Sequence, residues 1–129
     1  MIAVDTNIVV RFVARDEPEQ SALAAGCISE GVFVSEGVLM ETEWVLRHAF
    51  GWRRARINHA LALFLSIEQV TVAQPDHLQW ALDRHRDGAD WADMLHLIAA
   101  RGQSAFATFD RKLAALSGND PPLPLRLLK

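Results

Sequence analysis

The feature that most constrains the fold is an alternation of short apolar runs with longer amphipathic segments. The short runs occupy residues 2–4, 32–35, 70–73 and 104–109, and a last one is expected at 124–128. Each run is strand-sized, and the segments between most of them have the length that a crossover between parallel strands needs. The sequence therefore predicts an α/β fold with three α/β/α layers, in which helices cover a mainly parallel central sheet of four to five strands.

The helices are predicted by apolar residues at helical spacing and by residues that start or stop a helix. Pro18 and Pro75 suit the first turn of a helix, with Asp16 as the expected N-cap before Pro18. Gly102 suits a helix end. The expected helices cover residues 8–14, 18–30, 36–50, 53–66, 75–86, 90–100 and 111–117.

Composition narrows the class of protein. A chain of 129 residues is expected to form one domain, residues 1–129, with a real core. Its net charge of −3 argues against a protein that coats nucleic acid by bulk positive charge, but it permits a local basic groove. The single Cys27 excludes a disulfide framework. No signal peptide or membrane span is expected, so the predicted location is the cytoplasm.

Carboxylates stand where the predicted strands end and the predicted helices begin. Asp5 and Asp110 each follow a strand, whereas Glu41 and Asp93 lie in the first turns of helices. In open parallel sheets, ligands bind beyond the carboxyl ends of the strands, where helix starts also lie. We therefore expect these four acids to face one edge of the sheet.

Several carboxylates in one pocket repel each other unless a cation lies among them. A hard divalent cation such as Mg²⁺ or Mn²⁺ prefers oxygen ligands of this kind. It also lowers the pKa of bound water and stabilises charge on a phosphoryl oxygen. The pattern therefore predicts hydrolysis of a phosphodiester.

Each acid also has a purely structural interpretation. Asp5, Asp90 and Asp110 could cap the helices that follow them, and Asp93 could stabilise a helix start through the dipole. Glu41 could be a solvated helix acid, as Glu36 and Glu43 are expected to be. The gathering of so many acids at one predicted edge favours the metal site.

Four motifs, taken in order and spacing, resemble the PIN domain over essentially the whole chain. They are "AVDTN", "VLMETEWVLR", "DWADMLHLIAA" and "FATFD". The closest likeness is to the VapC-type toxins of toxin–antitoxin modules. The resemblance implies an acidic catalytic and metal-binding quartet of Asp5, Glu41, Asp93 and Asp110, with Glu43 as the competitor for the second position.

The resemblance also implies the surroundings of the quartet and its chemistry. Thr6, Asn7, Asp90 and Thr108 match supporting polar positions. Proteins of this type are Mg²⁺- or Mn²⁺-dependent endoribonucleases that usually form homodimers. A cognate VapB-like antitoxin inhibits them by placing a C-terminal segment near the active site, so a hetero-oligomer is also expected. His96 is expected to be a surface or interface residue rather than a ligand.

RNA binding by a mildly acidic chain needs local basic residues. Arg111 and Lys112 directly follow Asp110, and Arg11 lies on the helix after Asp5, so these three are the candidates for substrate contact. Exposed single-stranded loops are the usual targets of specific RNA recognition. The tryptophans are expected in the core or at interfaces, and Trp91 is the one placed best to contact a base.

Apolar residues of the early helices could either accept an antitoxin helix in a groove or form core. They are Val9, Val10, Phe12, Val13, Leu23, Ile28, Trp44, Val45 and Phe50.

Two other classes of function fit part of the pattern. A phosphorylation-controlled receiver domain also has parallel strands that end in acids, but it needs a phosphoacceptor Asp after the third strand, where this chain has Ala73-Gln74-Pro75. A catalytically silent binding module, whose acids only cap helices, is the other alternative. The metal-dependent ribonuclease accounts for more of the acids than either.

Overall fold

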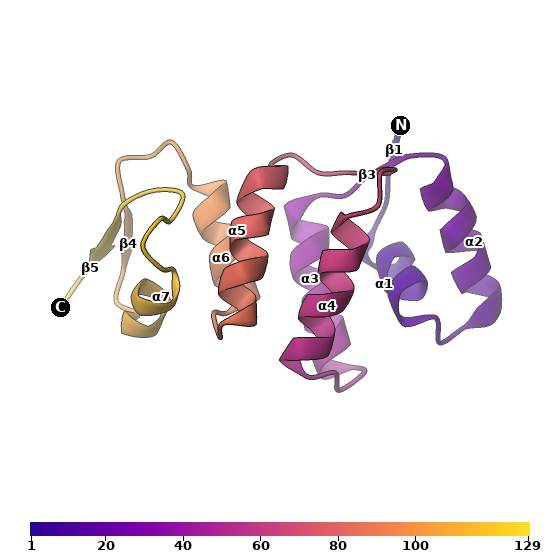
Figure 1. Ribbon diagram of the computed structural model, residues 1–129, viewed down its shortest axis with the longest axis horizontal. Coiled ribbons are helices and arrows are strands. Elements are labelled where there is room, and N and C mark those ends of the chain that lie inside the picture. Colours follow the sequence, from indigo (N-terminus) through magenta and orange to yellow (C-terminus); the bar gives the residue numbers. More distant parts are fainter. The chain divides into compact units, whose positions relative to one another are not determined.

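A computed structural model describes residues 1–129 as two compact units, Met1–Ala73 and Gln74–Lys129 (Figure 1). Each unit has its own helices, its own parallel strands and its own buried apolar residues. We describe the two units one at a time. The single domain 1–129 stays a prediction.

The first unit alternates short strands with pairs of helices. Its elements are β1 (Ile2–Ala3), α1 (Thr6–Ala14), α2 (Pro18–Ser29), β2 (Val32–Phe33), α3 (Glu36–His48), α4 (Arg54–Leu65) and β3 (Val70–Thr71). The strands form one parallel sheet in the order β1-β2-β3, with Ile2 opposite Val32 and Val32 opposite Val70. Backbone hydrogen bonds extend this ladder at Val4 and Val34, just after the first two strands.

Apolar faces of the four helices supply the core of the first unit. α1 packs against both α2 and α3, and α3 packs against α4. The buried apolar residues are Val4, Val9, Val10, Ala24, Ile28, Val32, Val34, Leu39, Leu46, Ile57, Leu61 and Phe64. This packing fixes the start of α1 relative to α3, the two helices that carry the predicted acids of this unit.

The second unit contains α5 (Pro75–Arg86), α6 (Trp91–Ala99), β4 (Phe106–Thr108), α7 (Arg111–Leu116) and β5 (Leu125–Leu127). A turn at Gly88 joins α5 to α6, and the two helices pack side by side (Figure 1). The φ of Gly88 is +116°, a conformation that suits glycine. β4 and β5 pair in parallel, with Phe106 opposite Leu125. The largest buried side chain here is that of Trp91, which is 1% exposed.

The structure confirms the α/β class and the parallel pairing, but not the single central sheet of four to five strands. It contains a three-stranded sheet and a separate two-stranded sheet instead. The strands have only two or three residues each, so few ladder hydrogen bonds join them. A period-two apolar pattern predicts which residues are extended, whereas the pairing of such short strands depends on tertiary packing that the pattern does not contain.

All seven predicted helices are present, with ends that differ by a few residues at most. The N-cap of α2 was predicted wrongly. Glu17, not Asp16, accepts hydrogen bonds from the first turn of α2, while Asp16 forms an ion pair with Arg11 at 3.2 Å. None of the helices is both long enough and apolar enough to cross a bilayer.

Candidate active site

Asp5 lies between β1 and α1 and caps the helix. Its Oδ1 accepts a hydrogen bond from the backbone N–H of Ile8 at 3.1 Å. This bond fixes the side chain in one orientation, while Oδ2 accepts no hydrogen bond and the residue is exposed. The cap therefore holds the carboxylate and leaves one of its oxygens open to a ligand.

Glu41 is brought to the start of α1 by the packing of α1 on α3. The hydroxyl of Thr6, the residue after Asp5, donates to Glu41 Oε1 at 3.0 Å. Glu41 is exposed, and its second oxygen makes no hydrogen bond. The first unit thus places two predicted acids at neighbouring positions, with the predicted supporting residue Thr6 between them.

Glu43, the competitor for the second acidic position, has a different environment. Its side chain is only 6% exposed, and both of its oxygens bind the Arg47 guanidinium, at 2.7 and 3.2 Å. It is therefore not the solvated acid that was expected. Nor is Glu36 fully solvated, because its Oε2 is buried without a hydrogen-bond partner.

Asp90 and Asp110 cap helices of the second unit. Asp90 Oδ2 accepts from the N–H of Asp93 at 3.0 Å, at the start of α6. Asp110 Oδ1 accepts from two N–H groups of α7, those of Lys112 at 2.9 Å and Leu113 at 3.0 Å. The Thr108 hydroxyl accepts from the Asp110 N–H at 2.9 Å, which agrees with a supporting position. Each capping aspartate again keeps one oxygen without a hydrogen bond.

Asp93, in the first turn of α6, lies in a negative environment. Partial burial raises the pKa of its carboxyl group, and the negative charges of Asp90 and Asp110 raise that pKa further. The exposed His96, one helical turn later, lowers it in part. Asp90 and Asp110 therefore lie close enough to Asp93 to disfavour its ionised form.

The donor chemistry of these residues fits a hard divalent cation. All four predicted ligands are carboxylates, and Mg²⁺ and Mn²⁺ prefer such oxygen donors. A cation would also relieve the repulsion that raises the pKa of Asp93. Within neither unit do three Asp, Glu, His or Cys side chains gather closely enough to hold a metal ion. The residue types therefore suit a divalent cation, but within each unit they are not gathered into a metal site.

The predicted RNA-contacting residues divide into two kinds. Arg111 and Lys112 are exposed in the first turn of α7 and form no ion pair. Arg11 is instead held by its neighbours, because its Nε donates to Gln20 at 2.8 Å and its Nη1 contacts Asp16. Arg11 therefore links α1 to α2, whereas the other two side chains are available to a phosphate.

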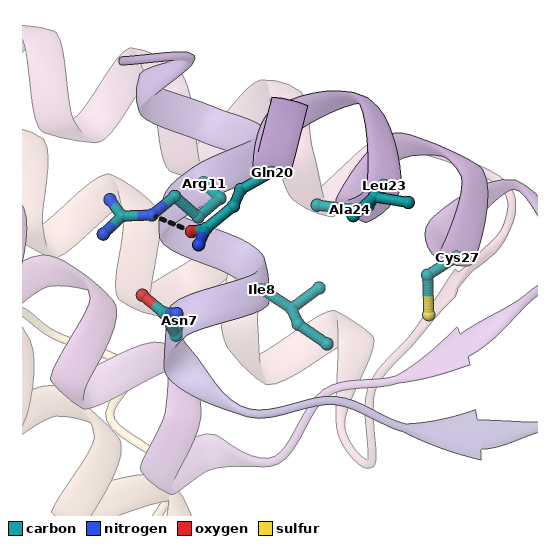
Figure 2. Close-up of a pocket in the computed structure, with 7 residues that line it drawn as sticks. All are labelled: Asn7, Ile8, Arg11, Gln20, Leu23, Ala24 and Cys27. Carbon is teal, nitrogen blue, oxygen red and sulfur yellow. Dashed lines mark hydrogen bonds between the residues drawn. The ribbon is translucent and has the colours of Figure 1, made fainter. Parts of the chain in front are cut away.

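A pocket of about 200 Å³ lies between α1 and α2 (Figure 2). The predicted supporting residue Asn7 lines it, together with Ile8, Arg11, Gln20, Leu23, Ala24 and Cys27. Leu23 is 70% exposed, while Val9, Val10 and Ile28 are buried core. Among the other apolar residues proposed for a groove, Phe12 and Val13 line a different pocket, and Trp44 is exposed.

The tryptophans were expected in the core or at interfaces, and Trp91 is indeed buried. It was also the one placed best to contact a base, but it packs edge-on against His85, with the ring centroids 5.6 Å apart. Trp44 is 55% exposed on α3, one helical turn beyond Glu41. Its position three residues after Glu41 could have identified Trp44 from the sequence, because residues three apart share a helix face.

Comparison with known proteins identifies the family of the chain. The model of the PIN domain family matches residues 2–119, which is nearly the whole chain. No curated protein and no solved structure matches this chain. PIN domains are typically metal-dependent nucleases and commonly use Mg²⁺. The extent of the match, together with the parallel strands and the acids at the helix starts, shows that this chain belongs to the PIN domain family.

Proposed function

We propose that the protein is a Mg²⁺- or Mn²⁺-dependent endoribonuclease and acts as the toxin of a toxin–antitoxin module. One observation carries the nuclease proposal. Asp5, Glu41 and Asp110 are each fixed by a hydrogen bond through one oxygen and present a second oxygen without a partner. Carboxylates that are held in this way are suited to bind a metal ion.

In this proposal the four acids bind the metal and their neighbours position them. Asp5, Glu41, Asp93 and Asp110 are the metal ligands. The bound ion would supply a nucleophilic water near neutral pH and stabilise charge on the phosphoryl group. Thr6 holds Glu41 and Thr108 holds the backbone of Asp110.

Asp90 contributes by capping α6, which fixes the first turn that carries Asp93. The substrate is RNA, and Arg111 and Lys112 contact its phosphates. Both side chains are exposed next to Asp110, and Lys and Arg supply most phosphate contacts in nucleic-acid complexes. Single-stranded RNA suits this arrangement, because its bases are not hidden in a helix.

The cognate antitoxin, in this proposal, places an amphipathic segment against α1 and α2, where the pocket in Figure 2 exposes Leu23. In this proposal the protein also forms a homodimer and acts in the cytoplasm. The unpaired Cys27 agrees with a reducing compartment.

The test exploits the similarity of Asp and Asn as helix caps. Asp5→Asn and Asp110→Asn remove a charge while keeping a good capping residue, so both variants should fold. We expect the wild type to cleave single-stranded RNA with Mg²⁺ or Mn²⁺ and not with EDTA. We expect each variant to lose at least about 100-fold in cleavage rate with an unchanged melting temperature.

The capping bonds also favour a second candidate, a binding module that is catalytically silent. Asp5, Asp90 and Asp110 all form the hydrogen bonds that this interpretation requires. The same assay separates the two functions. Wild-type protein that cleaves no RNA with either metal supports the silent module, and so do variants that cleave as fast as the wild type.

A further inference from the structure

We propose that Trp44 is a stacking platform for an unpaired base of the RNA substrate. The inference rests on the proposed ribonuclease function and adds a substrate-positioning residue to it. It starts from the exposure of Trp44, which is 55% accessible on the surface of α3. An aromatic ring with this exposure offers part of its π-surface to a ligand.

The position of Trp44 connects it to the acids of the first unit. Glu41, Trp44 and His48 follow one another at spacings of three and four residues, so they share one face of α3. Glu41 is in turn joined to the start of α1 by the Thr6 hydroxyl, directly after Asp5. A nucleotide stacked on Trp44 would therefore lie one helical turn from a proposed metal ligand.

The indole ring is also held in place. The ring of His48 contacts it, with centroids 4.5 Å apart and planes tilted by 39°. A ring that is ordered before the ligand arrives loses less conformational freedom on binding. Trp52 differs in exposure, because it is half-buried and the guanidinium of Arg56 lies 3.8 Å from its ring centroid.

The surroundings of Trp44 favour a base over an apolar protein surface. The exposed residues near it on α3 are all polar, namely Glu41, Arg47 and His48, while its apolar neighbours Met40 and Val45 are half-buried. Interfaces between proteins are centred on contiguous apolar patches, whereas the exposed neighbours of this ring are charged or polar. An isolated aromatic face among polar groups suits a nucleobase, since every base has a π-face that can stack.

The experiment measures RNA binding separately from cleavage. Fluorescence anisotropy gives the Kd of a labelled single-stranded oligoribonucleotide for the full-length Asp5→Asn protein, alone and combined with Trp44→Ala, Trp44→Phe or Trp52→Phe. We expect Trp44→Ala to raise Kd by about tenfold or more. Trp44→Phe should retain most of the affinity, and the Trp52→Phe control should match its parent.

Cleavage by proteins with Asp5 intact supplies a second readout. Stacking that holds the substrate equally in the ground and transition states should raise KM in Trp44→Ala with little change in kcat. Leu63→Ala is the matched surface control, because Leu63 is 56% exposed on another helix, α4. It should leave both constants unchanged.

Three results would overturn the inference. If Trp44→Ala binds RNA as tightly as its parent while the wild type cleaves RNA, the stacking role fails and the ribonuclease proposal stands. If the wild type neither binds nor cleaves RNA, both proposals fail together. If Trp44→Ala changes the sedimentation of the protein from dimer to monomer, Trp44 belongs to an interface between copies instead.

Discussion

The two units hold their acids in different ways. In the first unit, the acids are held by uncharged donors, since the backbone N–H of Ile8 binds Asp5 and the Thr6 hydroxyl binds Glu41. In the second unit, carboxylates lie among carboxylates, and the pKa of Asp93 is raised by burial and by two neighbouring aspartates. The first arrangement orients its acids, whereas the second also builds up negative charge that a cation would neutralise.

The comparison shows that a helix cap and a metal ligand are compatible roles for one side chain. A cap uses one carboxylate oxygen and fixes the rotamer, so the other oxygen is presented at a constant position. Asp5 and Asp110 both follow this pattern, one in each unit. Substitutions that change the charge of a side chain but keep its capping hydrogen bond can therefore separate the two roles.

The largest expected effect distinguishes the two glutamates of α3. Glu41→Gln should lower the rate of RNA cleavage by about 100-fold or more, because a proposed metal ligand loses its charge. Glu43→Gln should retain cleavage but destabilise the fold by about 1 kcal/mol, since it breaks an ion pair whose carboxylate is buried and whose Arg47 side chain is 46% exposed. Cleavage kinetics and urea denaturation measure the two effects. The reverse pattern, with Glu43 essential for cleavage, would exchange their roles.

A moderate effect is expected at the cap of α6. Asp90→Ala should reduce the free energy of unfolding by about 1 kcal/mol, because the hydrogen bond to the Asp93 N–H is lost. Asp90→Asn should preserve most of that free energy. Chemical denaturation of both variants tests this difference. Equal stabilities for the alanine and asparagine variants would mean that the cap contributes nothing.

The smallest effect concerns the repulsion around Asp93. In metal-free protein near neutral pH, Asp93→Asn should match or slightly exceed the wild type in free energy of unfolding, because solvent screens the repulsion at this partly exposed side chain and keeps the gain small. The sign follows from the raised pKa of Asp93, because ionising the group costs more in the folded chain than in the unfolded one. Denaturation with and without EDTA measures it. A clear loss of stability would show that the Asp93 carboxylate is stabilising without metal.

The same pKa shift predicts a pH dependence. The favourable contribution of protonated Asp93 is complete below the unfolded value of 3.8 and is lost as pH rises through the higher folded pKa. The difference in unfolding free energy between the wild type and Asp93→Asn should therefore change over acidic pH and stay constant above the folded pKa. Denaturation series across acidic pH for both proteins test the trend. A difference that begins to change only near neutral pH would contradict this cause.

Local features were predictable from sequence because they depend on neighbouring residues. The helices, the caps at Asp5, Asp90 and Asp110, and the stop at Gly102 follow from propensity and capping chemistry. The PIN motifs also gave the family correctly. The pairing of two- and three-residue strands was not predictable, because it depends on tertiary packing. The choice of Glu17 over Asp16 as a cap is local, because α2 begins at Pro18 and the N-cap is the residue just before it.

The burial of individual side chains was the other feature that the sequence did not predict. Trp91 and Trp44 both lie on helices beside acids, and the sequence placed Trp91 best to contact a base, whereas Trp44 is the exposed one. Helical periodicity gives the face of a residue, but not whether another element covers that face. The ion pair of Glu43 with Arg47 joins residues four apart on α3, but the burial of Glu43 depends on how α3 packs, so the contrast between Glu41 and Glu43 appears only in the structure.

Calorimetric titration with Mn²⁺ tests the central claim most directly, because it measures metal binding by the acids without reference to a substrate. Wild-type protein should bind Mn²⁺, and Asp5→Asn and Asp93→Asn should each weaken that binding by at least about tenfold while they remain folded. Unchanged Mn²⁺ affinity in both folded variants, or no binding by the wild type, would contradict the assignment of these carboxylates as metal ligands.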